Sequence, residues 1–165
     1  MSSQARRFST LGTALVLGFS LFAAPTYAQT GPFQNLAGNW SGAGTITFSN
    51  GSRERIRCRV AYAVQAGGGA MQQELRCASD SYRFDVSSTV QSSGANLSGQ
   101  WTEVSRGVTG SVTGQANSSQ LEALIQAPGF VASLSMRTSG NKQTVTLRPT
   151  GFEVSDVSVA LSRSR

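Results

Sequence analysis

The chain has 165 residues and a formal net charge of +6, with 14 basic and 8 acidic side chains. Only 13% of the residues are charged, glycine is frequent, and histidine is absent. Imidazole is the usual general base and a common zinc ligand, so its absence removes most hydrolytic and metal-dependent arrangements. We therefore expect no enzyme, no metal site and no cofactor.

The first thirty residues follow the pattern of a secretory signal peptide. Arg6 and Arg7 form a basic start, residues 11–24 are uncharged and largely apolar, and small residues precede a cleavage site after Ala28. The apolar run is shorter than the roughly twenty residues that a membrane anchor needs. We predict a signal peptide at 1–28, a periplasmic or secreted protein, and no transmembrane segment in the remainder.

Cleavage at that point leaves 137 residues, which by length form a single domain. We expect a polar lead-in at 29–37 and a β domain at 38–165. Loss of Arg6 and Arg7 lowers the net charge to +4, because twelve basic side chains then face eight acidic ones. This modest positive charge favours anionic partners without requiring them.

Alternating hydrophobicity predicts an all-β domain. In residues 53–62, Ile56, Cys58, Val60 and Tyr62 share one face, whereas arginines occupy the other. Clusters of Gly, Ser, Asn and Pro separate such runs at the spacing of a meander. Ten short strands are predicted to begin near residues 39, 53, 70, 82, 95, 107, 119, 130, 142 and 153.

Consecutive hairpins indicate an up-and-down antiparallel sheet. A large sheet with one apolar face tends to close, because closure removes its exposed edges. Five glycines fall at inward positions, which suits either sharp bends or an internal cavity: Gly42, Gly44, Gly99, Gly110 and Gly114. We expect an antiparallel up-and-down meander barrel of about 8–10 strands with one disulfide; a β-sandwich is the alternative.

Hairpin registers follow from the rule that inward residues pair with inward residues. A hairpin centred on the glycines at 67–68 places Cys58 opposite Cys77 on the inner face, within reach of a disulfide. These are the two cysteines of the chain, and an even pair in an oxidising compartment also favours a disulfide. A further hairpin near residue 140 pairs Met136 with Val145.

The same registers gather arginines on the outer face. The second hairpin places Arg59 beside Arg76, and a two-residue turn at 79–80 places Arg76 beside Arg83, with Arg57 flanking the row. Like charges directly opposite each other destabilise a strand pair. Either nearby carboxylates or a bound anion must therefore compensate this candidate anion patch.

The segment Gly38-Asn39-Trp40 opens the first predicted strand. This motif and the strand order over residues 38–162 resemble the calycin group, which includes lipocalins, fatty-acid-binding proteins and avidins. In lipocalins the tryptophan closes one end of the barrel under an arginine from the last strand, and Arg163 is the matching residue here. The residues with which avidins contact biotin have no counterparts that we can place. The chain is also similar to uncharacterised exported proteins of rhizobia and related alphaproteobacteria.

The calycin resemblance implies that a small, amphipathic molecule binds inside the barrel. The alternative is an interior packed with side chains, in which Trp40 is only a plug. Gln73 and Ser88 fall on the inward face, where a dry core would exclude them, so they favour a polar cavity. The candidate cavity residues are Trp40, Tyr62, Gln73, Ser88 and Trp101.

Two other functions compete with ligand binding in the barrel. The outer arginine face would suit an anionic envelope polymer or a protein partner, and no nucleic acid is expected. A carboxylate-based hydrolase would need a pair such as Glu74 and Asp85, but these residues lie on the outer face, where carboxylates usually serve as surface charge. The outward arginines also argue against an integral membrane barrel, which carries an apolar outer band.

Overall fold

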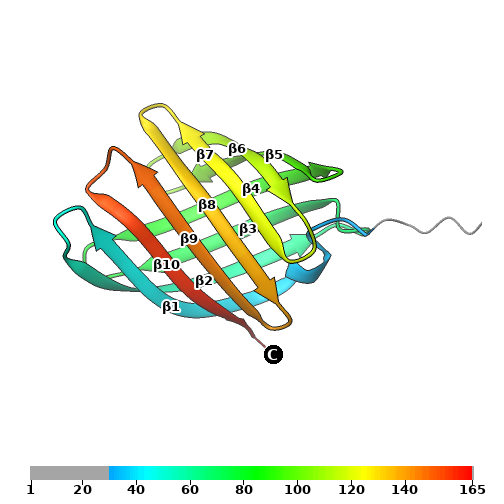
Figure 1. Cartoon of the computed structure of the whole chain (residues 1–165), viewed down its shortest axis with the longest axis horizontal. Helices are drawn as coiled ribbons and strands as arrows, with labels where there is room; N and C mark the ends of the chain where they lie inside the picture. The colour runs from blue at the N-terminus through cyan, green and yellow to red at the C-terminus, as the bar shows by residue number, and fades with distance from the viewer. Residues whose placement is uncertain (1–29, 165) are drawn as a thin grey trace, which may run out of the picture.

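A computed structural model describes residues 30–164, and the predicted signal peptide lies outside this range. The described chain is a closed barrel of ten antiparallel strands preceded by a short 3₁₀ helix, η1 (Gln34–Leu36) (Figure 1). The strands are β1 (Gly38–Phe48), β2 (Arg53–Val64), β3 (Ala70–Ala78), β4 (Arg83–Ser93), β5 (Asn96–Glu103), β6 (Val108–Ala116), β7 (Gln120–Ala127), β8 (Phe130–Ser139), β9 (Lys142–Thr150) and β10 (Val154–Arg163). Each begins within one residue of its predicted position.

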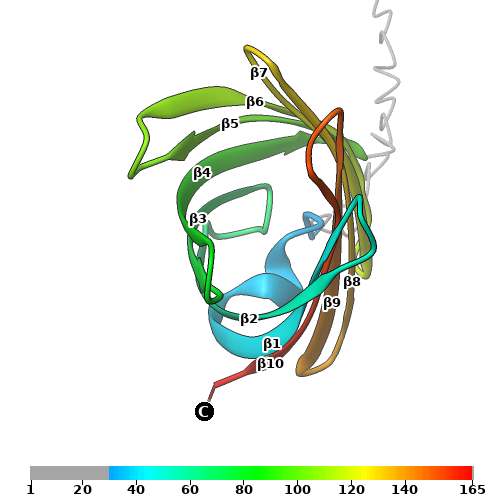
Figure 2. The same cartoon turned by 90° about the vertical axis from the view of Figure 1, so that its left-hand side faces the viewer.

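The strands follow one another around the barrel in chain order, and β1 closes the ring by pairing with β10 (Figure 2). Every strand thus has two hydrogen-bonded neighbours, as the prediction of a closed meander requires. The alternation of β2 gives the sheet one apolar face, which closure of the barrel turns inward. Ile56, Cys58, Val60 and Tyr62 are buried, whereas the arginines between them are exposed. No helix within residues 30–164 has the length and apolarity needed to cross a membrane.

The inward glycines mark places where neighbouring strands approach too closely for a side chain. A Cβ on Gly42 would come within 1.9 Å of the Ala160 carbonyl oxygen, and one on Gly44 within 1.9 Å of the Ser158 carbonyl oxygen. These glycines are therefore explained by sharp bends of the sheet, where the backbones of neighbouring strands come close together.

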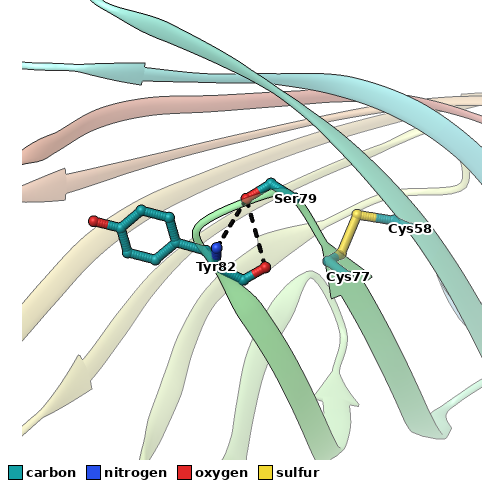
Figure 3. The surroundings of a disulfide bond; sticks show 4 residues. All are labelled: Cys58, Cys77, Ser79 and Tyr82. Carbon is teal, nitrogen blue, oxygen red and sulfur yellow. Dashed lines mark hydrogen bonds between the residues drawn. A yellow bond between two sulfur atoms is a disulfide. The ribbon is translucent and has the colours of Figure 1, made fainter.

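Two predicted registers are confirmed. Cys58 lies opposite Cys77 and is joined to it by a disulfide between β2 and β3 (Figure 3), and Met136 lies opposite Val145. Arg59 lies opposite Arg76, as predicted.

The predicted two-residue turn at 79–80 is wrong. The β3–β4 connection is a four-residue loop in which the Ser79 amide donates to the Tyr82 carbonyl (2.8 Å) and the Ser79 hydroxyl accepts from the Tyr82 amide (3.0 Å; Figure 3). Glu54 stabilises this loop by accepting hydrogen bonds from the hydroxyls of Ser79 (2.5 Å) and Ser81 (2.6 Å). The longer loop shifts the register by two residues.

Candidate ligand-binding site

One end of the barrel is closed around Trp40. The indole ring is 1% exposed, and its Nε1 donates a hydrogen bond to the Leu36 carbonyl of η1 (2.7 Å). The Arg163 guanidinium lies over the ring, 4.4 Å from its centroid, and also donates to the carbonyls of Ala37 and Asn35. This is the arrangement that the resemblance to lipocalins implied, with an arginine of the last strand covering the tryptophan.

Tyr62 fills the same end from β2, the strand that pairs with the β1 strand of Trp40. Its hydroxyl reaches from β2 to β9 and donates to Gln143 Oε1 (3.1 Å), whose Nε2 donates to Thr138 Oγ1 (3.2 Å). All three side chains are buried, and burial raises the pKa of Tyr62 above its ordinary value. The hydroxyl therefore remains a proton donor, and its buried polar partners are satisfied.

The other end is bordered by aromatic side chains, and we call this end the mouth. Its rings form two groups by their contacts. Phe48 lies 5.7 Å from Tyr82, and Tyr82 stacks on Phe84 at 6.1 Å. Phe130 lies 5.8 Å from Trp101 and 5.1 Å from Phe152. The mouth residues are Phe48, Tyr82, Phe84, Trp101, Phe130 and Phe152.

A polar contact ties the loops of the mouth together. The Tyr82 hydroxyl, in the β3–β4 loop, donates a hydrogen bond to the Glu153 carboxylate in the β9–β10 loop. This bond raises the pKa of the Tyr82 hydroxyl, because the carboxylate favours its protonated form. The backbone carbonyl of Glu153 also accepts from the Ser49 amide (2.7 Å), so three loops are linked.

Behind the mouth, part of the inner wall remains in contact with solvent. Gln73, Ser88 and Trp101 lie in one row across β3, β4 and β5, point inward and are half-buried. Within residues 30–164, the Gln73 and Ser88 side chains have no hydrogen-bond partner. The indole edge of Trp101 lies on Gly110, where a Cβ would come within 2.6 Å of Nε1, and this shielded N–H has no acceptor in the described chain.

The five predicted cavity residues thus fall into two sets. Trp40 and Tyr62 are buried at the closed end, whereas Gln73, Ser88 and Trp101 are half-buried. Tyr62 lies directly opposite Gln73, so one row of inward residues runs from the closed end to the wall behind the mouth. The other aromatic residues of the mouth were not predicted. Alternate hairpin loops of a meander lie at the same end of the barrel, so aromatic residues beside those loops were a signal that could have identified them.

A second candidate site lies on the outer face of β2–β4. The four predicted patch residues are exposed and line one open cleft of about 630 Å³: Arg57, Arg59, Arg76 and Arg83. The predicted row is corrected, because Arg76 lies opposite Asp85 and bonds to it (3.4 Å), while Arg83 lies opposite Ala78. The two-residue register shift caused by the longer β3–β4 loop is the reason.

The chain has fold relatives but no detected sequence relatives. No protein-family model matches it, and no curated protein matches it in sequence. Among solved structures, Rv2717c from M. tuberculosis is similar with a TM-score of 0.60 and 17% identity, covering 80% of this chain and 94% of that chain. The S-type phycobiliprotein lyase CPES from Guillardia theta has a TM-score of 0.54 and 8% identity, covering 81% of this chain and 90% of that chain. Both similarities show a shared β-barrel fold.

Proposed function

We propose that this chain is an exported, calycin-like binding protein that holds a small amphipathic ligand inside its barrel. The observation that carries the proposal is the half-buried inner wall behind the mouth. Inward side chains there remain in contact with solvent, whereas those around Trp40 do not. A largely apolar wall with a few polar groups is typical of small-ligand sites.

The chemistry of the wall suggests how such a ligand is oriented. The mouth aromatics offer apolar area to the body of the ligand, and Gln73 and Ser88 offer unused donors and acceptors to its polar end. A hydroxyl or amide group suits these neutral partners better than a charged group, because neither side chain can neutralise a charge.

Two observations support the calycin relationship and export. The Arg163–Trp40 contact at the closed end agrees with the lipocalin arrangement, and the structural neighbours share the barrel. The Cys58–Cys77 disulfide agrees with an oxidising compartment, as does the pattern of residues 1–28.

Binding is proposed rather than catalysis because the carboxylates near the mouth are already engaged. Glu103 accepts hydrogen bonds from the amides of Asp85 (3.2 Å) and Arg106 (2.7 Å), and Glu153 accepts one from Tyr82. Burial alone raises the pKa of Glu103, but these amides and the Arg106 guanidinium together lower it below its ordinary value. Such a carboxylate is a poor proton donor or acceptor at neutral pH.

Tryptophan fluorescence tests the proposal directly, because the chain has two tryptophans, one at each end of the barrel. Dodecanol, a neutral amphiphile, should change the emission in a saturable manner. The change should disappear in Trp101→Phe, whose remaining Trp40 is shielded. Phe130→Ala should weaken binding, because it removes a ring that packs against Trp101.

Leu124→Ala is the matched control, since Leu124 points outward from β7 and is 40% exposed. It should bind dodecanol like the wild type. Absence of any saturable change in the wild type contradicts the proposal, as does equal weakening by Phe130→Ala and Leu124→Ala.

A further inference from the structure

A row of arginines runs along the outer face of β2. We call it the arginine track, and its members are Arg53, Arg55, Arg57 and Arg59, all exposed. Alternate residues of a strand are about 6–7 Å apart, so the track extends over about 20 Å. Its neighbours on β1 are small residues, paired with the track in order: Thr47, Thr45, Ala43 and Ser41. The guanidinium groups therefore stand above their surroundings.

Two surface clefts adjoin the track. The first, of about 430 Å³, is lined by residues 43–45 and 53–55. These include the carboxylate of Glu54, which accepts hydrogen bonds from Ser79 and Ser81. The second is the 630 Å³ cleft lined by Arg57 and Arg59. The two clefts are lined by successive residues of β2, so an extended ligand that lies along this strand passes over both.

The second cleft is built around a small floor. Arg57, Ala78 and Arg83 lie in one row across β2, β3 and β4, so a methyl group separates the two arginines. Arg59 and Arg76 lie directly opposite each other in the adjacent row. The arrangement leaves space above Ala78 that guanidinium groups surround.

Most of this charge has no acidic partner. Among residues 30–164, Arg76 is the one member of the track and cleft that forms a salt bridge, with Asp85. The salt bridges of Arg106 and Arg148 lie elsewhere on the barrel. Arginines facing one another across strands weaken the sheet, and a bound polyanion would offset that cost.

The side chains around the track discriminate between classes of polyanion. Guanidinium groups bind carboxylate, sulfate and phosphate through paired hydrogen bonds. The described strands β1–β4 carry no outward aromatic residue on which bases of a single-stranded nucleic acid could stack. Phe84 also lines the second cleft, but its ring already stacks on Tyr82. Their outward apolar residues are small alanines, which offer little to a membrane surface.

We propose that the arginine track and its two clefts bind an acidic polysaccharide. The polymer lies along β2, and its carboxylate or sulfate groups contact successive arginines. This site is on the outer face and is independent of ligand binding in the barrel.

Polygalacturonate at low salt is the probe, with uncharged dextran as the reference polymer. The test variant is Arg55→Gln/Arg57→Gln/Arg59→Gln. The matched control is Arg137→Gln/Lys142→Gln/Arg148→Gln, which removes the same charge from exposed positions on β8 and β9. The test variant should bind roughly tenfold more weakly than the wild type, the control variant should bind like it, and added salt should weaken all binding.

Three results overturn the proposal: no binding of polygalacturonate by the wild type, equal weakening in both variants, or tighter binding of a single-stranded oligonucleotide or of phosphatidylglycerol vesicles than of polygalacturonate. Dodecanol binding by the test variant is measured in parallel. Because these arginines lie outside the barrel, it should remain at the wild-type level, which separates failure of this proposal from failure of the interior site.

Discussion

At the end of the barrel covered by η1, the aromatic side chains Phe33, Trp40 and Tyr62 are 0%, 1% and 7% exposed. At the mouth, Phe152 is 44% exposed and the other five rings are half-buried. The closed end also satisfies its polar atoms, since Trp40 and Tyr62 both donate hydrogen bonds. One end therefore has the properties of a protein core, and the other has those of a surface.

This difference indicates that the mouth contributes less to the stability of the barrel than the closed end does. Apolar area left in water forgoes about 25 cal/mol per Å² relative to burial, and the mouth leaves such area exposed while the closed end does not. Exposed apolar patches rimmed by polar groups mark binding sites more often than structural ones. The comparison thus links aromatic exposure to the proposed ligand site.

Replacing one aromatic residue at each end gives the largest expected contrast. Trp40→Ala should lower the free energy of unfolding by roughly 3–5 kcal/mol, because it opens a cavity and abandons the Leu36 and Arg163 contacts. Phe152→Ala should cost less than about 1 kcal/mol, since its ring is partly in water. Urea denaturation measures both. Equal losses would show that the ends do not differ; Trp40→Phe provides a milder variant if Trp40→Ala fails to fold.

The disulfide should stabilise the wall next to the mouth, because Cys77 lies directly opposite Phe84. Cys58→Ser/Cys77→Ser removes a covalent link across 19 residues and should cost roughly 3 kcal/mol, visible as a lower melting temperature. Free thiols in the purified wild-type protein would contradict the assigned bridge.

Strand positions and the two confirmed registers, β2–β3 and β8–β9, were predictable because they depend on local patterns. Alternation in β2 and the glycines at 67–68 were enough to place Cys58 against Cys77. The contact between Trp40 and Arg163 was anticipated through the calycin resemblance, since no local pattern relates the two termini of the barrel.

The failures involve interactions between distant residues. The β3–β4 loop lengthens because Glu54 of β2 accepts hydrogen bonds from Ser79 and Ser81, and nothing within the loop reveals this partner. The mouth was not predicted from the sequence for a related reason. Its rings come from six strands or loops, and only closure of the barrel brings Trp101 against Phe130.

Glu103 offers an intermediate effect that depends on pH. Its lowered pKa means that the ionised carboxylate stabilises the fold above the ordinary carboxyl pKa, and that this stabilisation is lost as pH falls through the folded-state pKa. Glu103→Gln should cost roughly 1–2 kcal/mol at neutral pH, because two amides and Arg106 lose a charged acceptor. The difference from the wild type should shrink in acid. A difference that is constant from pH 7 to pH 3 would contradict this explanation.

Tyr82→Phe should give the smallest effect and tests whether the mouth is held by its polar tie or by ring packing. The variant keeps the contacts with Phe48 and Phe84 but loses the hydrogen bond to Glu153. Because this bond raises the Tyr82 pKa, its stabilising contribution is present below the ordinary tyrosine pKa and disappears as pH rises through the folded-state value. Melting temperatures of wild type and variant should therefore differ slightly at pH 7 and converge at high pH. Tyr62 is present in both proteins, so its own titration cancels in this comparison. If the difference persists at high pH, the effect comes from packing, and the mouth would resemble the closed end more than its exposure suggests.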